Sequence, residues 1–549
     1  MSRFASAKNN DELVRSLTKR NAIERLTGFR RLRALLRKEA DSESGSAGAG
    51  ERKTAATRRH RTIGQLSNFL YRRGSRRRMA LTVVIVVVVS FFLGQRGFSY
   101  GDLIIVFSSL ILGVIVFNGE RGIHYGFVLW VLTLALGYRT IQWTPNLHIH
   151  PAEVLLWGLL ACVCVQRHLV STSRLTFPLW IWLLMPFWVF AWWPLILGNA
   201  AWDQMLSEFR DFLLLIPLMI VATVVLRQHH NWQWLLLAFF TASTWIAVMG
   251  ILEFWVSGIA TLFPAMITST SAGTVEGFER AMFSFWGGPM ATFICALALP
   301  LAIVAARWWQ AGWQRALIIA SAIAQGIAIY IGGYRSIWLF VVIEILVACL
   351  LSLKRQRVTI AAICLVVIIG GYQLVPQAAS HRAFTGIEAL RGRATDSSAR
   401  DRINRAEGAL DQMFSAPLGN GWSAAGWVHS DFLQVGANLG LLGGLIFFGG
   451  YLYTLGRIGR RVLLESRTEG QGDLGVALFL SYISVGGILA TQGVEVLPQL
   501  VLPVWFVWVL VEVWLRQKAE GKEINAAVAT SYPYQLRRFD YPMGLRTDV

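Results

Sequence analysis

Residues 334–353 read YRSIWLFVVIEILVACLLSL, and after Arg335 the only charged side chain in this stretch is Glu344. A helix of about 20 residues rises about 30 Å, which is the thickness of the hydrocarbon core of a bilayer. The bilayer interior offers no water to unpaired backbone groups, so an apolar stretch that crosses it must be helical. The stretch therefore predicts a membrane-spanning helix.

Apolar blocks of similar length recur along most of the chain. Of its 549 residues, 55% are hydrophobic and only 15% are charged, and the mean hydropathy is +0.50. A soluble domain needs more polar surface than this composition supplies. We therefore predict an all-α fold, a polytopic membrane helix bundle of about 12–14 transmembrane helices with a helical extracytoplasmic loop cap. The predicted spans are residues 79–94, 102–118, 122–138, 151–166, 176–197, 209–226, 232–256, 287–306, 313–331, 334–353, 357–375, 433–455, 474–491 and 496–516.

The basic residues between the spans predict how the chain enters the membrane. Cytoplasmic loops of membrane proteins carry an excess of Lys and Arg. With the amino terminus inside, thirteen basic residues fall in the short inner connections and five in the outer ones, so both termini are predicted to be cytoplasmic. The inner set is Arg121, Arg167, Arg174, Arg227, Arg307, Arg315, Lys354, Arg355, Arg357, Arg457, Arg460, Arg461 and Arg467, and the outer set is Arg96, Arg139, Arg210, Arg280 and Arg335.

The first 78 residues form a separate basic arm in this interpretation. They contain 21 Lys and Arg against seven Asp and Glu, so about +14 of the net charge of +19 precedes the first apolar block. Apolar residues at helical spacing over residues 9–39 predict a basic amphipathic helix, which is typical of binding to anionic membrane lipids rather than nucleic acid. The predicted domains are residues 1–78 as a cytoplasmic arm, 79–516 as the transmembrane domain and 517–549 as a cytoplasmic tail.

Two longer loops lie outside the membrane in this topology, residues 257–286 and 376–432. Arginines in the second loop form either a solvated helical face or an anion site, because guanidinium groups match phosphate oxygens in pairs. His429 lies where this loop re-enters the membrane, and an imidazole pKa of about 6.5 suits removal of a proton from a sugar hydroxyl. Ser430 and Asp431 follow it and are candidates to cap the next helix. The loop arginines are Arg382, Arg391, Arg393, Arg400, Arg402 and Arg405.

Four further charged residues lie at or within apolar segments. Arg280 and Arg335 are placed at the outer face, where an arginine near the bilayer boundary either snorkels or serves a site. Glu253 and Glu344 lie within predicted spans. They belong either to an ion path or, in the interpretation that we favour, to hydrogen bonds between helices.

Three segments resemble the O-antigen ligase and O-antigen polymerase superfamily. The segments 417–422 (PLGNGW) and 428–448 (VHSDFLQVGANLGLLGGLIFF) resemble the family pattern P-L-x-G-x-G, then H-N-x-[YF]-L-Q, then G-L-x-G. Residues 332–346, GGYRSIWLFVVIEIL, resemble its small residue and Arg at the opening of an outer helix. Residues 279–303, ERAMFSFWGGPMATFICALALPLAI, resemble its Arg before a long apolar helix. The resemblance covers about residues 210–510; Met290 and Ser430 stand where the family has Asn, and Ala406 lies near a position where it has an aromatic residue.

This resemblance implies a metal-independent, inverting glycosyltransferase that needs no cofactor. Members transfer a glycan from a polyprenyl (undecaprenyl) diphosphate to an acceptor hydroxyl at the outer face of the bacterial inner membrane, in lipopolysaccharide O-antigen or exopolysaccharide assembly. The implied partners are the polyprenyl-diphosphate-linked glycan and a glycan or lipid acceptor. Residue by residue, Arg280 and Arg335 bind the diphosphate, Arg400 or Arg402 assists, and His429 activates the acceptor hydroxyl. Ligase, polymerase and protein transferase remain alternatives.

Two other classes of function stay open. A small-solute, bicarbonate-like transporter of the same superfamily predicts an open path through the bundle, with Glu253 or Glu344 coupling ions. A non-catalytic assembly scaffold predicts that the arginines lie far apart. The enzyme predicts a cavity that opens to the outside and to lipid, lined by Arg280, Arg335 and His429.

Overall fold

The fold was examined in a computed structural model of the chain. The residues that the structure describes are 120–136, 141–142, 148–167, 177–196, 202–226, 229–256, 274–275, 278–279, 283, 290–308, 312–351, 397–422, 428–465, 473–491 and 498–520. The chain divides into two units, Met1–Ala80 and Leu81–Val549, and every described residue belongs to the second. The predicted arm, the predicted spans 79–94, 102–118 and 357–375, and the tail from residue 521 lie outside the described residues.

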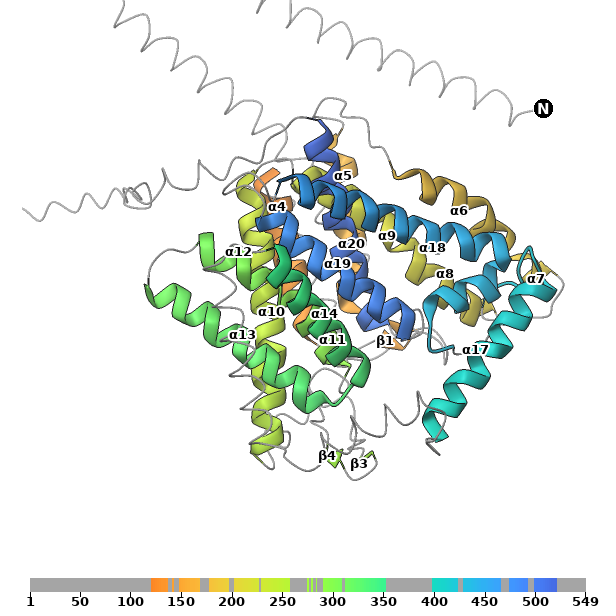
Figure 1. The fold of residues 1–549 in the computed structure, drawn as a ribbon. Coiled ribbons are helices and arrows are strands. Elements are labelled where there is room, and N and C mark those ends of the chain that lie inside the picture. The colour runs from red at the N-terminus through yellow and green to blue at the C-terminus, as the bar shows by residue number, and fades with distance from the viewer. Residues whose placement is uncertain are drawn as a thin grey trace, which may run out of the picture. The chain divides into compact units, whose positions relative to one another are not determined.

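The described part of the chain is almost entirely helical (Figure 1). Two antiparallel hairpins of two-residue strands accompany the helices, β1 (Ile141–Gln142) with β2 (His148–Ile149) and β3 (Thr274–Val275) with β4 (Phe278–Glu279). The helices are α4 (Glu120–Thr133), the 3-10 helix η1 (Leu134–Leu136), α5 (Pro151–Arg167), α6 (Leu179–Phe190), α7 (Trp193–Ile196), α8 (Trp202–Leu213), α9 (Leu215–Val225), α10 (His229–Trp255), α11 (Ala291–Ala298), α12 (Leu301–Trp308), α13 (Gly312–Gly332), α14 (Arg335–Leu351), α17 (Ser397–Ser415), α18 (Asp431–Glu465), α19 (Asp473–Thr491) and α20 (Pro498–Ala519).

The predicted fold class, an all-α polytopic membrane bundle, is confirmed. Among the described residues, five helices are long and apolar enough to cross a membrane, and they lie in α10, α13, α18, α19 and α20. Four shorter apolar helices, within α4, α5, α6 and α14, accompany them.

Three segments that hydropathy predicts as single spans are interrupted in the structure. Residues 176–197 form α6 and α7, residues 209–226 contain the break between α8 and α9, and residues 287–306 contain α11 and α12. Each break lies beside a proline: Pro194, Pro217 or Pro300. Proline lacks an amide hydrogen and its ring clashes with the carbonyl four residues earlier, so an otherwise apolar helix ends there.

The core of the described bundle is built around α20. Every residue of this helix from Leu500 to Leu515 is buried, including Glu512, as expected for a helix whose other side chains in this range are apolar. It packs against α9, α11, α18 and α19, and Figure 1 shows it between α9 and α19. Rings of Trp505 and Trp508 contact Phe447 of α18 with centroid distances of 6.2 and 5.7 Å. These aromatic contacts pack α18 against α20.

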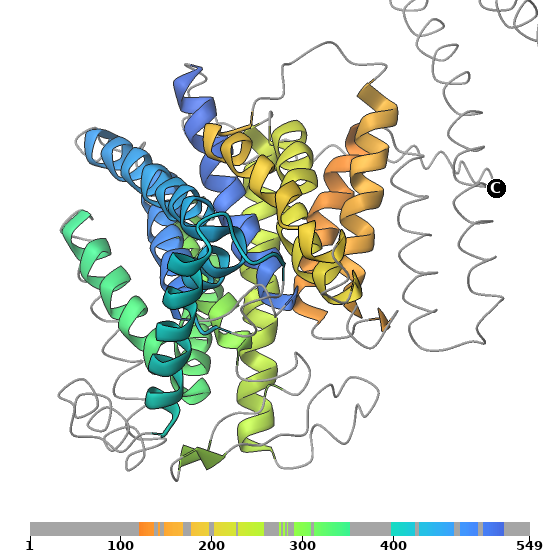
Figure 2. The ribbon, with the colours of Figure 1, turned by 90° about the vertical axis from the view of Figure 1, so that its right-hand side faces the viewer.

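The segments that belong to the two predicted outer loops lie at one end of the described unit. In Figures 1 and 2, the C-terminal end of α10, the β3–β4 hairpin and the N-terminal end of α17 are at the same end of the bundle. Helix α17 packs along α18, so residues 397–422 return from this end toward the start of α18.

Candidate functional site

The loop after α17 is anchored at the break between α6 and α7. The backbone N–H of Trp422 donates to the carbonyl of Ala191 at 3.1 Å, and the Trp422 indole N–H donates to the carbonyl of Trp188 at 3.2 Å. The proline-induced break therefore provides carbonyl groups that bind the loop. Gly421 has φ +95°, and a Cβ there would collide with the ring of Pro194, so this contact requires glycine.

A kink in α18 receives the same loop. Gly440 has φ 80° and ψ 174° inside α18, where the helix is locally broken. The carbonyl of Asn438, freed by the kink, accepts a hydrogen bond from the N–H of Gly421 at 3.0 Å. A Cβ on Gly440 would collide with the carbonyl of Pro417. The segment PLGNGW thus fits into the kink of the helix that follows it, which explains why its glycines are spaced as they are.

His429 lies at the junction of α17 and α18, close to charged side chains of α17. Burial lowers the pKa of His429 below its ordinary value, the positive charges of Arg402 and Arg405 lower it further, and Asp401 raises it in part. A lower pKa favours the neutral form of the imidazole, which is the form that accepts a proton. We call these four residues, Asp401, Arg402, Arg405 and His429, the His429 cluster.

The arginines of α17 differ in what they contact. Arg405 pairs with Asp401 one turn away at 2.9 Å, and both side chains are largely exposed. Arg400 is exposed to solvent. Arg402 is partly buried, and its Nε–H is buried without an acceptor among the described residues. Of the two predicted alternatives, Arg402 is the one whose charge lowers the pKa of His429.

The start of α18 is fixed by side-chain hydrogen bonds. The side-chain carbonyl of Gln434 accepts a hydrogen bond from the backbone N–H of Val428 at 3.2 Å. The backbone N–H of Gln434 donates to the carbonyl of Ser430 at 2.9 Å. The Ser430 hydroxyl donates to the carbonyl of Leu489 in α19 at 3.5 Å. Asp431, predicted with Ser430 as a cap, is instead the first residue of α18 and is buried. These bonds hold the backbone on both sides of His429.

The other two predicted arginines are only partly accounted for. Arg280 lies outside the described residues, and Arg335 is the first residue of α14, with only its backbone described. The turn before it is held by Gly333, at φ 68°, and by Tyr334, whose ring packs on Phe293 of α11 at 5.2 Å. The proximity of these arginines to His429 stays a prediction.

The two acidic residues predicted within spans also differ from each other. Glu344 is buried and accepts a hydrogen bond from Ser484, which joins α14 to α19. This confirms the predicted interhelical bond. Glu253, near the end of α10, is only partly buried.

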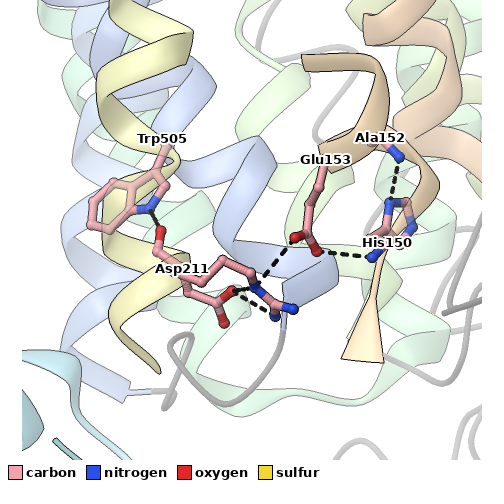
Figure 3. A network of polar contacts seen from close by, with 6 residues as sticks. His150, Ala152, Glu153, Asp211 and Trp505 are labelled. Carbon is pink, nitrogen blue, oxygen red and sulfur yellow. Dashed lines mark hydrogen bonds and ion pairs between the residues drawn. The ribbon is translucent and has the colours of Figure 1, made fainter. Parts of the chain in front are cut away.

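A second polar group, which the sequence did not predict, lies inside the bundle (Figure 3). The Arg210 guanidinium pairs with Glu153 of α5 at 3.2 Å and with its neighbour Asp211 at 2.9 Å. Glu153 also accepts the N–H of His150 at 2.9 Å, and Trp505 of α20 donates its indole N–H to the carbonyl of Asp211 at 2.8 Å. We call these five residues the Arg210 network.

The Arg210 network extends toward α18 through the same face of α8. Glu208 is one turn before Asp211 and accepts a hydrogen bond from the side-chain amide of Asn438 at 2.9 Å. Asn438 is also the residue whose carbonyl binds the loop at the kink. The polar interior is therefore connected to the loop that carries the His429 cluster.

The sequence analysis named Arg405 among the loop arginines without linking it to His429, and it did not name Glu208 or Asp211, although two signals were available. Arg405 lies three residues after Arg402, so the two share a helix face. Glu208, Arg210 and Asp211 are concentrated in the short segment that precedes the apolar residues of α9. Such a group of charges next to a span is expensive in a membrane unless its members pair.

No protein-family model matches this chain, and no curated protein matches it either. The family resemblance consequently rests on the three motifs quoted above.

Proposed function

We propose that the protein is a metal-independent, inverting glycosyltransferase of the O-antigen ligase or polymerase type. It transfers a glycan from a polyprenyl diphosphate to an acceptor hydroxyl at the outer face of a bacterial inner membrane, with both termini in the cytoplasm. The observation that supports this most directly is the His429 cluster, in which burial and the positive charges of Arg402 and Arg405 lower the pKa of the imidazole. The buried Nε–H of Arg402 is a donor suited to a phosphate oxygen.

In the proposed reaction His429 removes the proton from the acceptor hydroxyl. The oxygen attacks the anomeric carbon while the bond from that carbon to the diphosphate oxygen breaks, and the bonding electrons leave with the diphosphate. Guanidinium groups stabilise the negative charge that develops on the leaving group. A base and a leaving group on opposite faces of the sugar give inversion at the anomeric carbon. The products are the new glycoside, the polyprenyl diphosphate and a proton on His429.

In this proposal, binding of the diphosphate donor changes the pKa of the base that acts on the acceptor hydroxyl. Arg402 and Arg405 lower the pKa of His429 in the free protein. A bound diphosphate offsets those positive charges, so it raises the pKa and makes the imidazole a stronger base. The imidazole is consequently a stronger base when the glycan donor is bound than when it is absent.

The test is an in vitro transfer assay in nanodiscs with a native polyprenyl diphosphate glycan and a chelator present. We expect His429→Ala to lose about 10²–10⁴-fold in rate, the range for removal of a general base. Arg402→Ala, Arg280→Ala and Arg335→Ala are expected to lose activity as well. Glu407→Gln, on the exposed face of α17, is the matched control that retains activity. Wild-type turnover in the His429 variant would contradict the proposal.

A small-solute transporter is the second candidate, and a specific observation favours it. The kink at Gly440 breaks a membrane helix beside the buried pair of Asn438 and Glu208. Broken helices and buried acids are features of secondary transporters. Uptake of bicarbonate into proteoliposomes, with no glycan transfer under any donor, would replace the enzyme with this second candidate.

A further inference from the structure

The exposed side of α18 is apolar along most of the helix. Its exposed residues recur every three or four positions, which places them on one face. Figure 2 shows α18 at the margin of the described helices. In a membrane bundle, an apolar face of this kind is suited to contact the acyl chains of lipids. We call this face the α18 stripe; its residues are Leu442, Leu445, Phe448, Gly449, Leu452, Tyr453 and Gly456.

Arg460 continues the α18 stripe toward the C-terminal end of the helix. It follows Leu442 by 18 positions, and 3.6 residues per turn place both on the same face. The rise over these positions is about 27 Å, close to the thickness of about 30 Å of a hydrocarbon core. A stripe that begins at one boundary of the bilayer core therefore reaches Arg460 at the other boundary, where the phosphate groups of lipids lie.

Two arginines beside Arg460 are paired, and Arg460 is not. Arg457 pairs with Glu512 of α20 at 3.3 Å, and Arg461 pairs with Glu465 one turn further on at 2.9 Å. Arg460 is exposed between them and has no ion pair among the described residues. A guanidinium group on an apolar surface is costly unless an anion neutralises it. The charge of Arg460 is therefore available to an anion from outside the described helices.

The surroundings of Arg460 favour a lipid over a free phosphate ion. The α18 stripe precedes it, and the side chains of Leu463 and Leu464 beyond it are also exposed. Gly449 and Gly456 have open space around them, so an acyl chain can lie close to the helix backbone there. A free phosphate ion has no apolar part that could use this surface, whereas a phospholipid carries a phosphate group and acyl chains in one molecule.

We propose that Arg460 and the α18 stripe bind an anionic phospholipid of the phosphatidylglycerol type. The guanidinium group binds the headgroup phosphate, because its N–H groups match two phosphate oxygens, and the acyl chains lie along the stripe. In the predicted topology this end of α18 is cytoplasmic, and the cytoplasmic leaflet is the one that attracts basic residues near the membrane. The inference does not depend on glycan transfer, because an enzyme and a transporter are both surrounded by lipid.

The test is photo-crosslinking of the full-length protein in nanodiscs with lipids that carry a diazirine in one acyl chain. Phosphatidylglycerol and phosphatidylcholine with the same labelled chain are compared, and the labelling of α18 peptides is measured by mass spectrometry. We expect phosphatidylglycerol to label the α18 stripe about fivefold more, the factor that one basic residue contributes at a membrane surface. The exposed residues Trp245 and Val248 of α10, a helix without Lys or Arg, give the internal reference, where equal labelling is expected.

Three variants assign the preference to Arg460. Arg460→Gln should lower the ratio of phosphatidylglycerol to phosphatidylcholine at the α18 stripe to that at α10, whereas Arg460→Lys keeps the charge and should keep most of the preference. The matched control Arg461→Gln removes the same charge one position away, from an arginine that is already paired, and should keep the ratio.

Three outcomes overturn the proposal. They are a wild-type ratio at the α18 stripe equal to that at α10, a ratio that Arg460→Gln leaves unchanged, and equal losses in Arg460→Gln and Arg461→Gln. The last result would mean that lipid is attracted to the basic end of α18 as a whole and not to a site at Arg460. The changed side chains are exposed, so all three variants are expected to fold. None of these outcomes involves glycan transfer, so they are distinct from failure of the transfer assay.

Discussion

The His429 cluster and the Arg210 network both consist of charged side chains, but these side chains are in different surroundings. In the cluster, the side chains of Arg405 and Asp401 are 41% and 53% exposed. In the network, Arg210, Glu153 and Asp211 are 11%, 2% and 1% exposed. An exposed ion pair contributes about 0–1 kcal/mol, whereas removal of one member of a buried pair costs about 3–5 kcal/mol.

This difference separates charges that hold the fold from charges that are available to a ligand. Every member of the Arg210 network is tied to another helix or to the backbone, so a substrate that used them would have to break the bundle. Arg402 of the cluster keeps a buried donor without a described acceptor, and its charge lowers the pKa of His429. The cluster is therefore where chemistry is expected, and the network is where stability is expected.

The largest effect is expected for Arg210→Met. The change leaves Glu153 and Asp211 buried without their shared partner, so it should lower the free energy of unfolding by about 3–5 kcal/mol. Chemical unfolding in mixed micelles, followed by tryptophan fluorescence, measures it. The matched control Arg461→Ala removes an arginine from a pair with Glu465 in which the arginine is 43% exposed, and should change stability by about 0–1 kcal/mol. Equal losses of unfolding free energy in the two variants would mean that the Arg210 network stabilises the fold no more than an exposed ion pair does.

A smaller effect is expected for Gly440→Ala. Alanine there must adopt φ 80° and would collide with the backbone of Pro417, so we expect a loss of about 1–3 kcal/mol. Gly449 and Gly456 lie in the same helix with open space around them. Alanine at either position should stabilise the helix by about 0.5–1 kcal/mol.

The Gly440 variant also tests how the two regions are connected. The kink holds the loop that precedes His429, so Gly440→Ala should lower glycan transfer more than its effect on stability explains. The transfer rate is measured on the folded fraction at a temperature well below the unfolding midpoint. Unchanged transfer would mean that the loop reaches its place without the kink.

The sequence predicted the fold class because hydropathy alone identifies apolar helices. It failed at the helix breaks beside Pro194, Pro217 and Pro300. Hydropathy does not register these breaks, because it does not depend on the amide hydrogen that proline lacks. The kink at Gly440 carried a weaker signal, because α18 contains several glycines and only one has φ above zero.

The candidate site was predicted in part. His429 and Arg402 were named from a motif, and the charge of Arg402 lowers the pKa of His429 in the structure. Arg402 is partly buried and Arg400 is exposed, a difference that depends on which face of α17 packs on α18. The Arg210 network could not be predicted, because Glu153 precedes Arg210 by 57 positions and Trp505 follows it by 295. Such contacts are set by helix packing, about which the order of residues along the chain says little.

The pH response of His429 sharpens the contrast further. Its pKa is lowered in the folded protein, so the imidazole binds a proton less readily than in the unfolded chain. The folded state should consequently lose stability as pH falls from the ordinary value of about 6.5 toward the lowered pKa. Arg402→Gln removes one cause of the lowering and should raise the pKa. Modification of His429 by diethyl pyrocarbonate is measured across pH by mass spectrometry of the peptide that contains it. The titration gives the pKa of His429 in the wild type and in the Arg402→Gln variant. A lower pKa in the variant than in the wild type would contradict this account.

The smallest effect is expected for Asp401→Asn, which touches both properties of the cluster at once. Loss of the exposed pair with Arg405 should cost about 0.2–1 kcal/mol, because solvent screens both groups. The same change removes a negative charge that raises the pKa of His429, so this pKa should fall further, opposite to the effect of Arg402→Gln. Unfolding and the modification assay are measured on the same samples, with Glu407→Gln as the control for loss of a negative charge from α17. A large loss of stability with no change in the pKa of His429 would mean that Asp401 stabilises the fold, as the Arg210 network does. It would also mean that the charge of Asp401 does not set the pKa of His429.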